Sequence, residues 1–148
     1  MSRFLSIILG LIIASGLFSG SASAAISISS DRLEPCPSSP NCVVSVNGDE
    51  EHQIDPITYN SDRATAKETL LKVLSVVPRT EVIDSTDNYI HAESTSRIFK
   101  FVDDVEFYFP EDENVIHLRS ASRVGESDLG VNRRRMEQIR LAMQDLGI

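Results

Sequence analysis

The segment from Ile98 to Phe109 constrains the fold most, because its side chains alternate with the two-residue period of a strand. One face of this strand would carry Phe101, Asp103, Val105, Phe107 and Phe109, and the other Val102, Asp104, Glu106 and Tyr108. A polar stretch at 110–114 follows, and residues 115–122 return with a second alternating pattern. The two segments together predict an antiparallel hairpin with one face in the core.

The register of this hairpin follows from its apolar faces, which must coincide. Phe107 should therefore pair with Leu118, which places Glu106 opposite Arg119 and Asp104 diagonally from that arginine. Asp104 and Glu106 then share the polar face of the sheet with Arg119.

One helix is expected before these strands in the sequence, and one after them. Ser61 or Asp62 would begin the first, which runs to about residue 77 with apolar side chains at steps of three and four until Pro78 ends it. The second would run from about Asn132 to Leu146 with a buried apolar seam.

Shorter strand-like runs at 81–84 and 89–94 separate the first helix from the hairpin. The order predicts an α+β fold, namely an antiparallel three- to four-stranded meander with both helices packed on one face. We expect this single domain to span residues 54–148. Residues 25–53 would form a loop-rich, extended N-terminal arm.

An apolar run at residues 4–18 follows Arg3 and leads into small residues that end in Ala22-Ser23-Ala24. These features predict a secretory signal peptide over residues 1–24. An uncleaved anchor is the alternative, although the run is shorter than the ~20 residues that span a bilayer. The protein would be exported to the periplasm or, in a photosynthetic source, to the thylakoid lumen. No later segment of the sequence is apolar enough to span a membrane.

Cys36 and Cys42 are the only two cysteines, and prolines lie between and beside them. In an oxidising compartment this pattern predicts a local disulfide. Closing so short a loop contributes about 2–3 kcal/mol, which shapes a loop without holding the fold. The spacing fits neither a zinc module nor a C-x-x-C redox site, so no metal or other cofactor is expected.

Charge is divided along the chain. Residues 81–113 hold ten acids and two bases, whereas residues 119–140 hold six arginines and three acids. The two segments should attract each other within one fold. The formal net charge of −8 argues against nucleic acid as a partner.

Asp103 falls on the apolar face of its strand, where a carboxylate needs a partner. The candidates are Arg123 and the arginines at 133–135. The triplet opens a helix, where exposed cations oppose the helix dipole by about 0.3–1 kcal/mol each. Internal acids such as Asp103 or Asp128 would offset this cost, and so would a partner protein or a bound phosphate, sulfate or carboxylate.

Two functional hypotheses follow. In the first, the protein is a non-enzymatic binding or interaction module for an unknown protein or a small anionic ligand. The residues expected to bind are Arg119, Arg123, Asp128, Asn132, Arg133 and Arg135.

In the second hypothesis the protein is a hydrolase or lyase, with Asp104 and Glu106 as acid and base and Arg119 as an anion clamp. These residues belong to an acidic constellation of Asp103, Asp104 and Glu106. The same face would otherwise be a solvated charge ladder, at about 0.2–1 kcal/mol per pair. The chain contains no G-x-S-x-G, S-x-x-K, H-E-x-x-H or P-loop motif, which favours the non-enzymatic hypothesis.

Three runs carry a family resemblance: CPSSPNCV, FVDDVEF and RSASRVGESDLGVNRRRMEQIR. They resemble the bacterial and plastid family known as domain of unknown function 1499, over about Cys36 to Ile139. The resemblance implies a secreted or membrane-tethered domain. It brings no established activity and identifies no catalytic residue.

Overall fold

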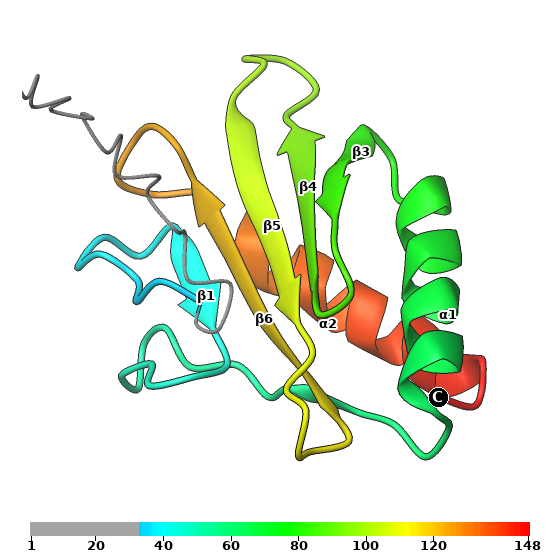
Figure 1. Cartoon of the computed structure of the whole chain (residues 1–148). Helices are drawn as coiled ribbons and strands as arrows, with labels where there is room; N and C mark the ends of the chain where they lie inside the picture. Colours follow the sequence, from blue (N-terminus) through cyan, green and yellow to red (C-terminus); the bar gives the residue numbers. More distant parts are fainter. Residues whose placement is uncertain (1–32) are drawn as a thin grey trace, which may run out of the picture.

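The computed structural model describes residues 33–148, so the expected signal peptide at 1–24 lies outside the described residues. Six strands form the sheet in the order β1-β6-β5-β4-β3, with β2 paired to one end of β6 (Figure 1). The elements are β1 Cys42–Val44, β2 Ile57–Thr58, α1 Arg63–Val76, β3 Thr80–Ser85, β4 Tyr89–Thr95, β5 Val102–Tyr108, β6 Val115–Ser122 and α2 Val131–Asp145. No helix in this part of the chain is long and apolar enough to cross a membrane.

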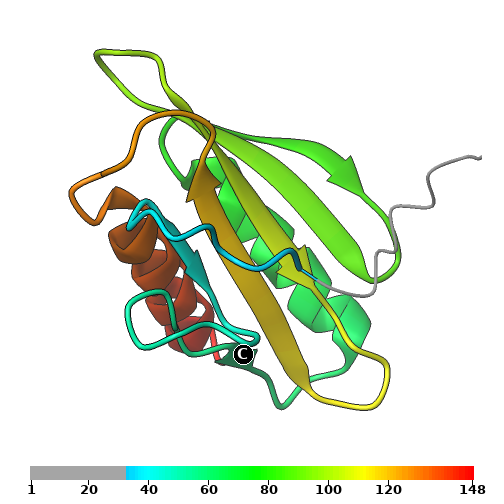
Figure 2. The ribbon, with the colours of Figure 1, turned by 90° about the vertical axis from the view of Figure 1, so that its left-hand side faces the viewer.

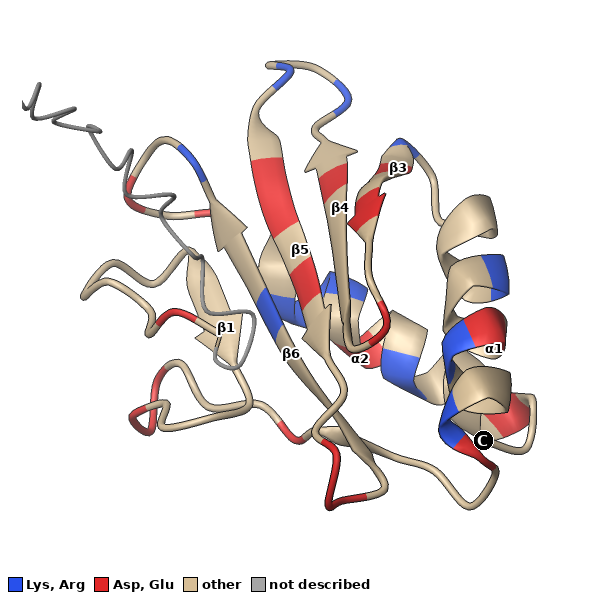
Figure 3. Ribbon diagram, viewed as in Figure 1, with Lys and Arg blue, Asp and Glu red and all other residues tan. Residues whose placement is uncertain are grey.

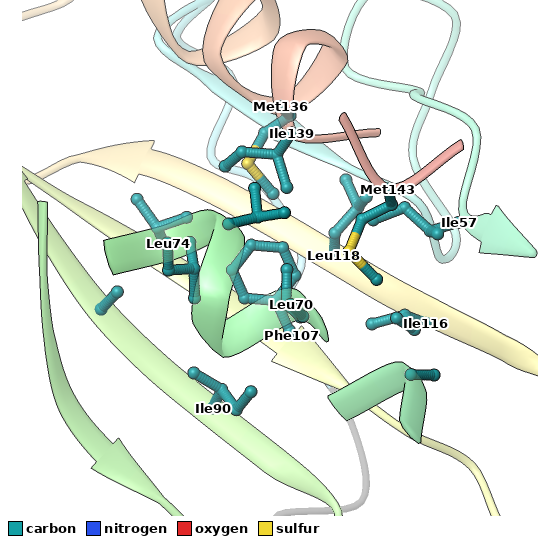
Figure 4. Close-up of a cluster of buried hydrophobic side chains, with 14 of the residues drawn as sticks. Ile57, Leu70, Leu74, Ile90, Phe107, Ile116, Leu118, Met136, Ile139 and Met143 are labelled. Atoms are coloured by element: carbon teal, nitrogen blue, oxygen red, sulfur yellow. The ribbon is translucent and has the colours of Figure 1, made fainter. Parts of the chain in front are cut away.

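Both helices pack against the same face of the sheet, which confirms the expected α+β class (Figures 1 and 2). One continuous core joins the apolar stripes of α1 and α2 to the inward side chains of the strands (Figure 4). Its largest fully buried members include Leu70, Leu74, Ile90, Phe107, Ile116, Leu118, Met136, Ile139 and Met143.

The hairpin of β5 and β6 has the register expected from its apolar faces. Phe107 pairs with Leu118 and Glu106 with Arg119. Side chains of β5 alternate strictly between buried and half-buried positions, because one face meets the helices and the other does not.

The sheet has more strands than the three or four expected. Two of the additional strands are β1 and β2, and β1 lies within the segment expected to be an extended arm. Val43 pairs with Ser120, and the amide of Ser45 donates to the carbonyl of Leu118 at 2.9 Å. The short buried run of β1 thus covers the edge that β6 would otherwise expose.

The strand expected from Ile98 begins only at Val102, so the prediction was wrong for residues 98–101. These residues complete the turn between β4 and β5. The amide of Ser96 donates to the carbonyl of Phe101 at 2.8 Å, and Lys100 has a left-handed φ of 57°. Ile98 and Phe99 are apolar, but the turn carries them beyond the sheet into solvent.

The Cys36–Cys42 disulfide is present, with 5.6 Å between the two Cα atoms. It holds a knuckle that contacts two other loops. Asn41 donates through Nδ2 to the carbonyl of Gly125 at 2.7 Å. His52 lies 3.1 Å from the carbonyl oxygen of Ser39 through Nε2. The disulfide therefore organises the loops at this edge of the sheet.

Candidate functional site

The sheet face opposite the helices carries an ion-pair ladder on neighbouring strands. Figure 3 shows the acidic positions of β4 and β5 and the basic position of β6 along these strands. We call this set the outer-face ladder and define it as Tyr89, His91, Glu93, Asp104, Glu106, Arg119 and Arg123. In its first rung, Arg119 Nη1 donates to Glu106 Oε2 at 2.7 Å. Tyr89 donates its hydroxyl to Glu106 Oε1, also at 2.7 Å. Burial and the neighbouring Glu106 carboxylate raise the pKa of Tyr89, which keeps its hydroxyl a donor.

The second rung joins Asp104 to Arg123 through two hydrogen bonds, from Nε at 2.9 Å and Nη2 at 2.8 Å. Arg123 also donates to Glu93, and His91 Nε2 lies 2.8 Å from Asp104 Oδ1. The Arg123 guanidinium, with help from His91, holds the pKa of Asp104 below its ordinary value against the opposing effect of partial burial.

His91, Glu93 and Asp104 also form the one group in residues 33–148 whose potential metal-ligand atoms all lie within 4.8 Å of one another. Arg123 already donates to both carboxylates of this group. The guanidinium thus supplies the positive charge that a metal ion would bring.

A second polar network lies between α2 and the sheet. Arg135 Nη2 donates to Asp103 Oδ2 at 2.7 Å, and the two side chains are 11% and 7% exposed. Arg135 is therefore the partner that the buried Asp103 needed. Its Nη1 also donates to Asn132 Oδ1 at 2.9 Å and to Ser120 Oγ at 3.2 Å.

Backbone amides at the beginning of α2 donate to a carboxylate of the protein itself. Gly130 has a left-handed φ of 75° and precedes the helix without a capping side chain of its own. Asp128 takes over that role, because its carboxylate accepts from the amides of Gly130 at 2.9 Å and Asn132 at 2.7 Å. The buried Asn132 donates to the carbonyl of Asn41 at 3.1 Å, which links α2 to the disulfide knuckle.

The side chain of Arg133 contacts a different part of the chain, namely a loop before β2. It donates to the backbone carbonyls of Glu51 at 2.7 Å and Gln53 at 2.8 Å. Its contacts join α2 to the loop after β1.

A groove of about 320 Å³ lies where the start of α2 meets the ends of α1 and β4 and the beginning of β3. We call it the basic groove and define it by its four arginines, Arg79, Arg97, Arg134 and Arg135. Ser96 and Gln138 add neutral polar groups, while Val77, Pro78 and Val131 supply apolar walls. Within residues 33–148, no carboxylate lines this groove.

Three of the groove arginines differ from those of the ladder. Arg79 donates to the carbonyl of Thr95 at 3.1 Å, and Arg134 donates to the carbonyl of Leu129 at 2.7 Å. Neither they nor Arg97 form an ion pair with a carboxylate of residues 33–148. Their charges are therefore compensated chiefly by solvent.

The structure brings together only part of the set proposed from sequence. Arg135 lines the basic groove, whereas Arg119, Arg123, Asp128, Asn132 and Arg133 make the internal contacts described above. Arg79, Arg97 and Arg134 were not selected from the sequence, although Arg134 belongs to the arginine triplet. Arg79 and Arg97 have no other arginine directly beside them in the sequence. The pairing of β3 with β4 brings them together.

Two comparisons with known proteins bear on this site. Residues 32–143 match the sequence model of the family described as "Protein of unknown function (DUF1499)". No curated protein matches the sequence.

Proposed function

Since the chain belongs to the DUF1499 family of proteins of unknown function, we propose its function from the geometry of its site. The protein is an exported, non-enzymatic binding module that holds a small anionic ligand in the basic groove. The family description states no activity, so the proposal depends on the arginines of the groove.

One observation carries the proposal: three exposed arginines line a single groove to which residues 33–148 contribute no carboxylate. By contrast, Arg119 and Arg123 on the sheet and Arg135, the fourth arginine of the groove, each donate to an acid. Clustered cations repel one another, and an oxyanion relieves that repulsion. Guanidinium groups suit this role because their planar fork binds phosphate, sulfate or carboxylate through paired hydrogen bonds.

The groove also lies at the positive end of the α2 dipole, which favours a negative charge there. Asp128 occupies two backbone amides of this region. The ligand would therefore be recognised mainly by guanidinium groups, with the helix dipole as a smaller contribution.

The size and walls of the groove limit the ligand. A volume of about 320 Å³ is at the small end of the range for ligand sites, which is roughly 300–1,000 Å³. Val77, Pro78 and Val131 offer apolar surface beside the arginines. We expect a phosphate ester, sulfate ester or carboxylate attached to a small, partly apolar group.

Two features support export as part of this proposal. The disulfide between Cys36 and Cys42 is typical of oxidising compartments. The apolar run at residues 4–18 has the composition of a secretory signal.

The enzymatic hypothesis has less support. Asp104 and Glu106 are both paired with arginines in the outer-face ladder. A general acid usually needs a raised pKa, whereas that of Asp104 is lowered by Arg123.

The test is the thermal stability of the oxidised protein in the presence of sulfate, inorganic phosphate and glycerol phosphate, at constant ionic strength. A ligand at 100 times its Kd adds about 2.7 kcal/mol of stability. We expect this stabilisation to disappear in a double variant with Arg97→Gln and Arg134→Gln.

Arg133→Gln is the matched control, because Arg133 is next to Arg134 in sequence but binds the carbonyls of Glu51 and Gln53. It should lower the basal stability and keep the anion response. The proposal is wrong if no anion stabilises the protein, or if the double variant retains the full response.

A further inference from the structure

The turn between β4 and β5 exposes a cluster of large apolar side chains. Ile98 is 77% exposed, Phe99 72% and Phe101 48%. The rings of the two phenylalanines stack with their centroids 5.5 Å apart, so they present one continuous apolar surface. Exposed clusters of this kind on a small protein usually mark an interaction site.

This turn projects from one end of the molecule. Figures 1 and 2 show the β4–β5 connection extending past the rest of the sheet in both views. Hydrogen bonds between Ser96 and Phe101 close its base, at 2.8 Å between backbone groups and 2.9 Å from the Phe101 amide to Ser96 Oγ. The apolar side chains therefore sit on a convex tip.

The charges of the tip are all positive. Arg97 and Lys100 are exposed within residues 96–101, and no acid occurs there (Figure 3). Lys100 lies between the two phenylalanines in sequence. Its long side chain can direct the ammonium group toward an anionic surface while the rings enter an apolar layer.

A second loop reaches the same end of the molecule. The amide of Arg123 donates to the carbonyl of Val102 at 3.0 Å, which places the loop after β6 beside the base of the tip. This loop exposes Val124 and Leu129, at 52% and 85%. Glu126 is its exposed acid, since Asp128 caps α2.

From these observations we infer that the Ile98–Phe101 tip docks on a membrane surface rich in anionic lipid. A convex apolar tip inserts readily between lipid headgroups, where aromatic rings are favoured. The flanking cations complement the negative charge of such lipids. The inference goes beyond the proposed anion groove and does not depend on its ligand.

The chain contains no tryptophan, so a single Phe99→Trp substitution creates a fluorescent reporter at the tip. The full chain would be titrated with vesicles of phosphatidylglycerol and phosphatidylcholine in equal parts, and with vesicles of phosphatidylcholine alone. We expect the emission to shift to shorter wavelength with the anionic vesicles only. Adding Lys100→Gln should raise the lipid concentration at half-shift about fivefold, since each cation near such a surface contributes about 1 kcal/mol.

Leu146→Trp is the matched control, because Leu146 is 61% exposed and directly follows α2, close to the C-terminus. Figures 1 and 2 place the C-terminus at the end of the molecule away from the tip. This reporter should not shift, even if residues 4–18 bind the vesicles.

Three results would overturn the inference: no shift at the tip, equal shifts for both reporters, or an equal shift with neutral vesicles. The first would direct attention to a protein partner for the tip. The stabilisation of the Phe99→Trp variant by sulfate tests the basic groove separately. The two proposals can therefore fail independently.

Discussion

The outer-face ladder and the basic groove are both built from arginines, but they use the charge differently. In the ladder, Arg119 and Arg123 lie within 3 Å of carboxylate oxygens. In the groove, Arg79, Arg97 and Arg134 have no such partner within residues 33–148. An arginine count alone would not separate these two regions, whereas the position of the acids does.

The difference follows from where each region lies in the fold. The ladder spans adjacent strands, on which every second side chain of one strand faces a side chain of the next. Acids on β4 and β5 therefore meet Arg119 on β6 and Arg123 just beyond it. The groove lies where helix and strand ends meet, and no pairing rule brings a carboxylate there.

The largest loss of stability is expected from removing Asp103, the carboxylate partner of Arg135. Asp103→Ala would leave its guanidinium buried without a carboxylate, and breaking a buried pair in this way costs about 3–5 kcal/mol. Urea denaturation would measure the loss. Asp84→Ala, an exposed acid on β3 without an ion pair in the described chain, should change stability by less than about 0.5 kcal/mol. Similar effects for both variants would mean that the Asp103–Arg135 pair does not hold α2 to the sheet.

An intermediate loss of stability is expected when an arginine of the ladder is replaced by alanine, and a smaller one when the same change is made in the groove. Arg119→Ala leaves the half-buried Glu106 without its charged donor, and we expect a loss of about 1.5–3 kcal/mol in the free energy of unfolding. Arg134→Ala removes an exposed groove residue and should cost less than about 0.5 kcal/mol. Equal losses in urea denaturation would remove the distinction between a structural ladder and a ligand groove.

The smallest effect is a pH dependence of stability to which the ladder contributes and the groove arginines do not. The pKa of Asp104 is lower in the folded protein than its ordinary value of 3.8, chiefly through Arg123. Its stabilising contribution is therefore complete above the unfolded pKa and is lost as the pH falls through the folded pKa. Melting temperatures measured from pH 5 downward should show this loss, and Asp104→Asn should reduce the slope of the curve.

Asp84→Asn is the control for this experiment, because Asp84 is exposed on β3 and forms no ion pair within residues 33–148. Arginine does not titrate in this range. The stabilisation of the protein by sulfate in the basic groove should therefore stay constant from pH 8 down through the acid range in which Asp104 titrates. A sulfate response that follows the titration of Asp104 would show that ladder and groove are one coupled site.

Sequence alone predicted the parts of the fold that depend on local period. The hairpin of β5 and β6 was predicted with its register, because a slip of one residue would turn Phe107 and Leu118 out of the core. The two helices follow from apolar side chains at three- and four-residue steps. The need of Asp103 for an arginine was also evident, since a carboxylate had been placed on an apolar face.

Tertiary structure alone decided the features from which the two proposals come. The pattern of residues 98–101 predicts the start of a strand. Only the closure of the turn between Ser96 and Phe101 makes these residues an exposed tip. Likewise, Arg79, Arg97 and Arg134 are far apart along the chain and meet only after β3, β4 and α2 have packed. The physical reason is that periodicity fixes which face of an element is buried, whereas the neighbours of its ends depend on how the whole chain packs.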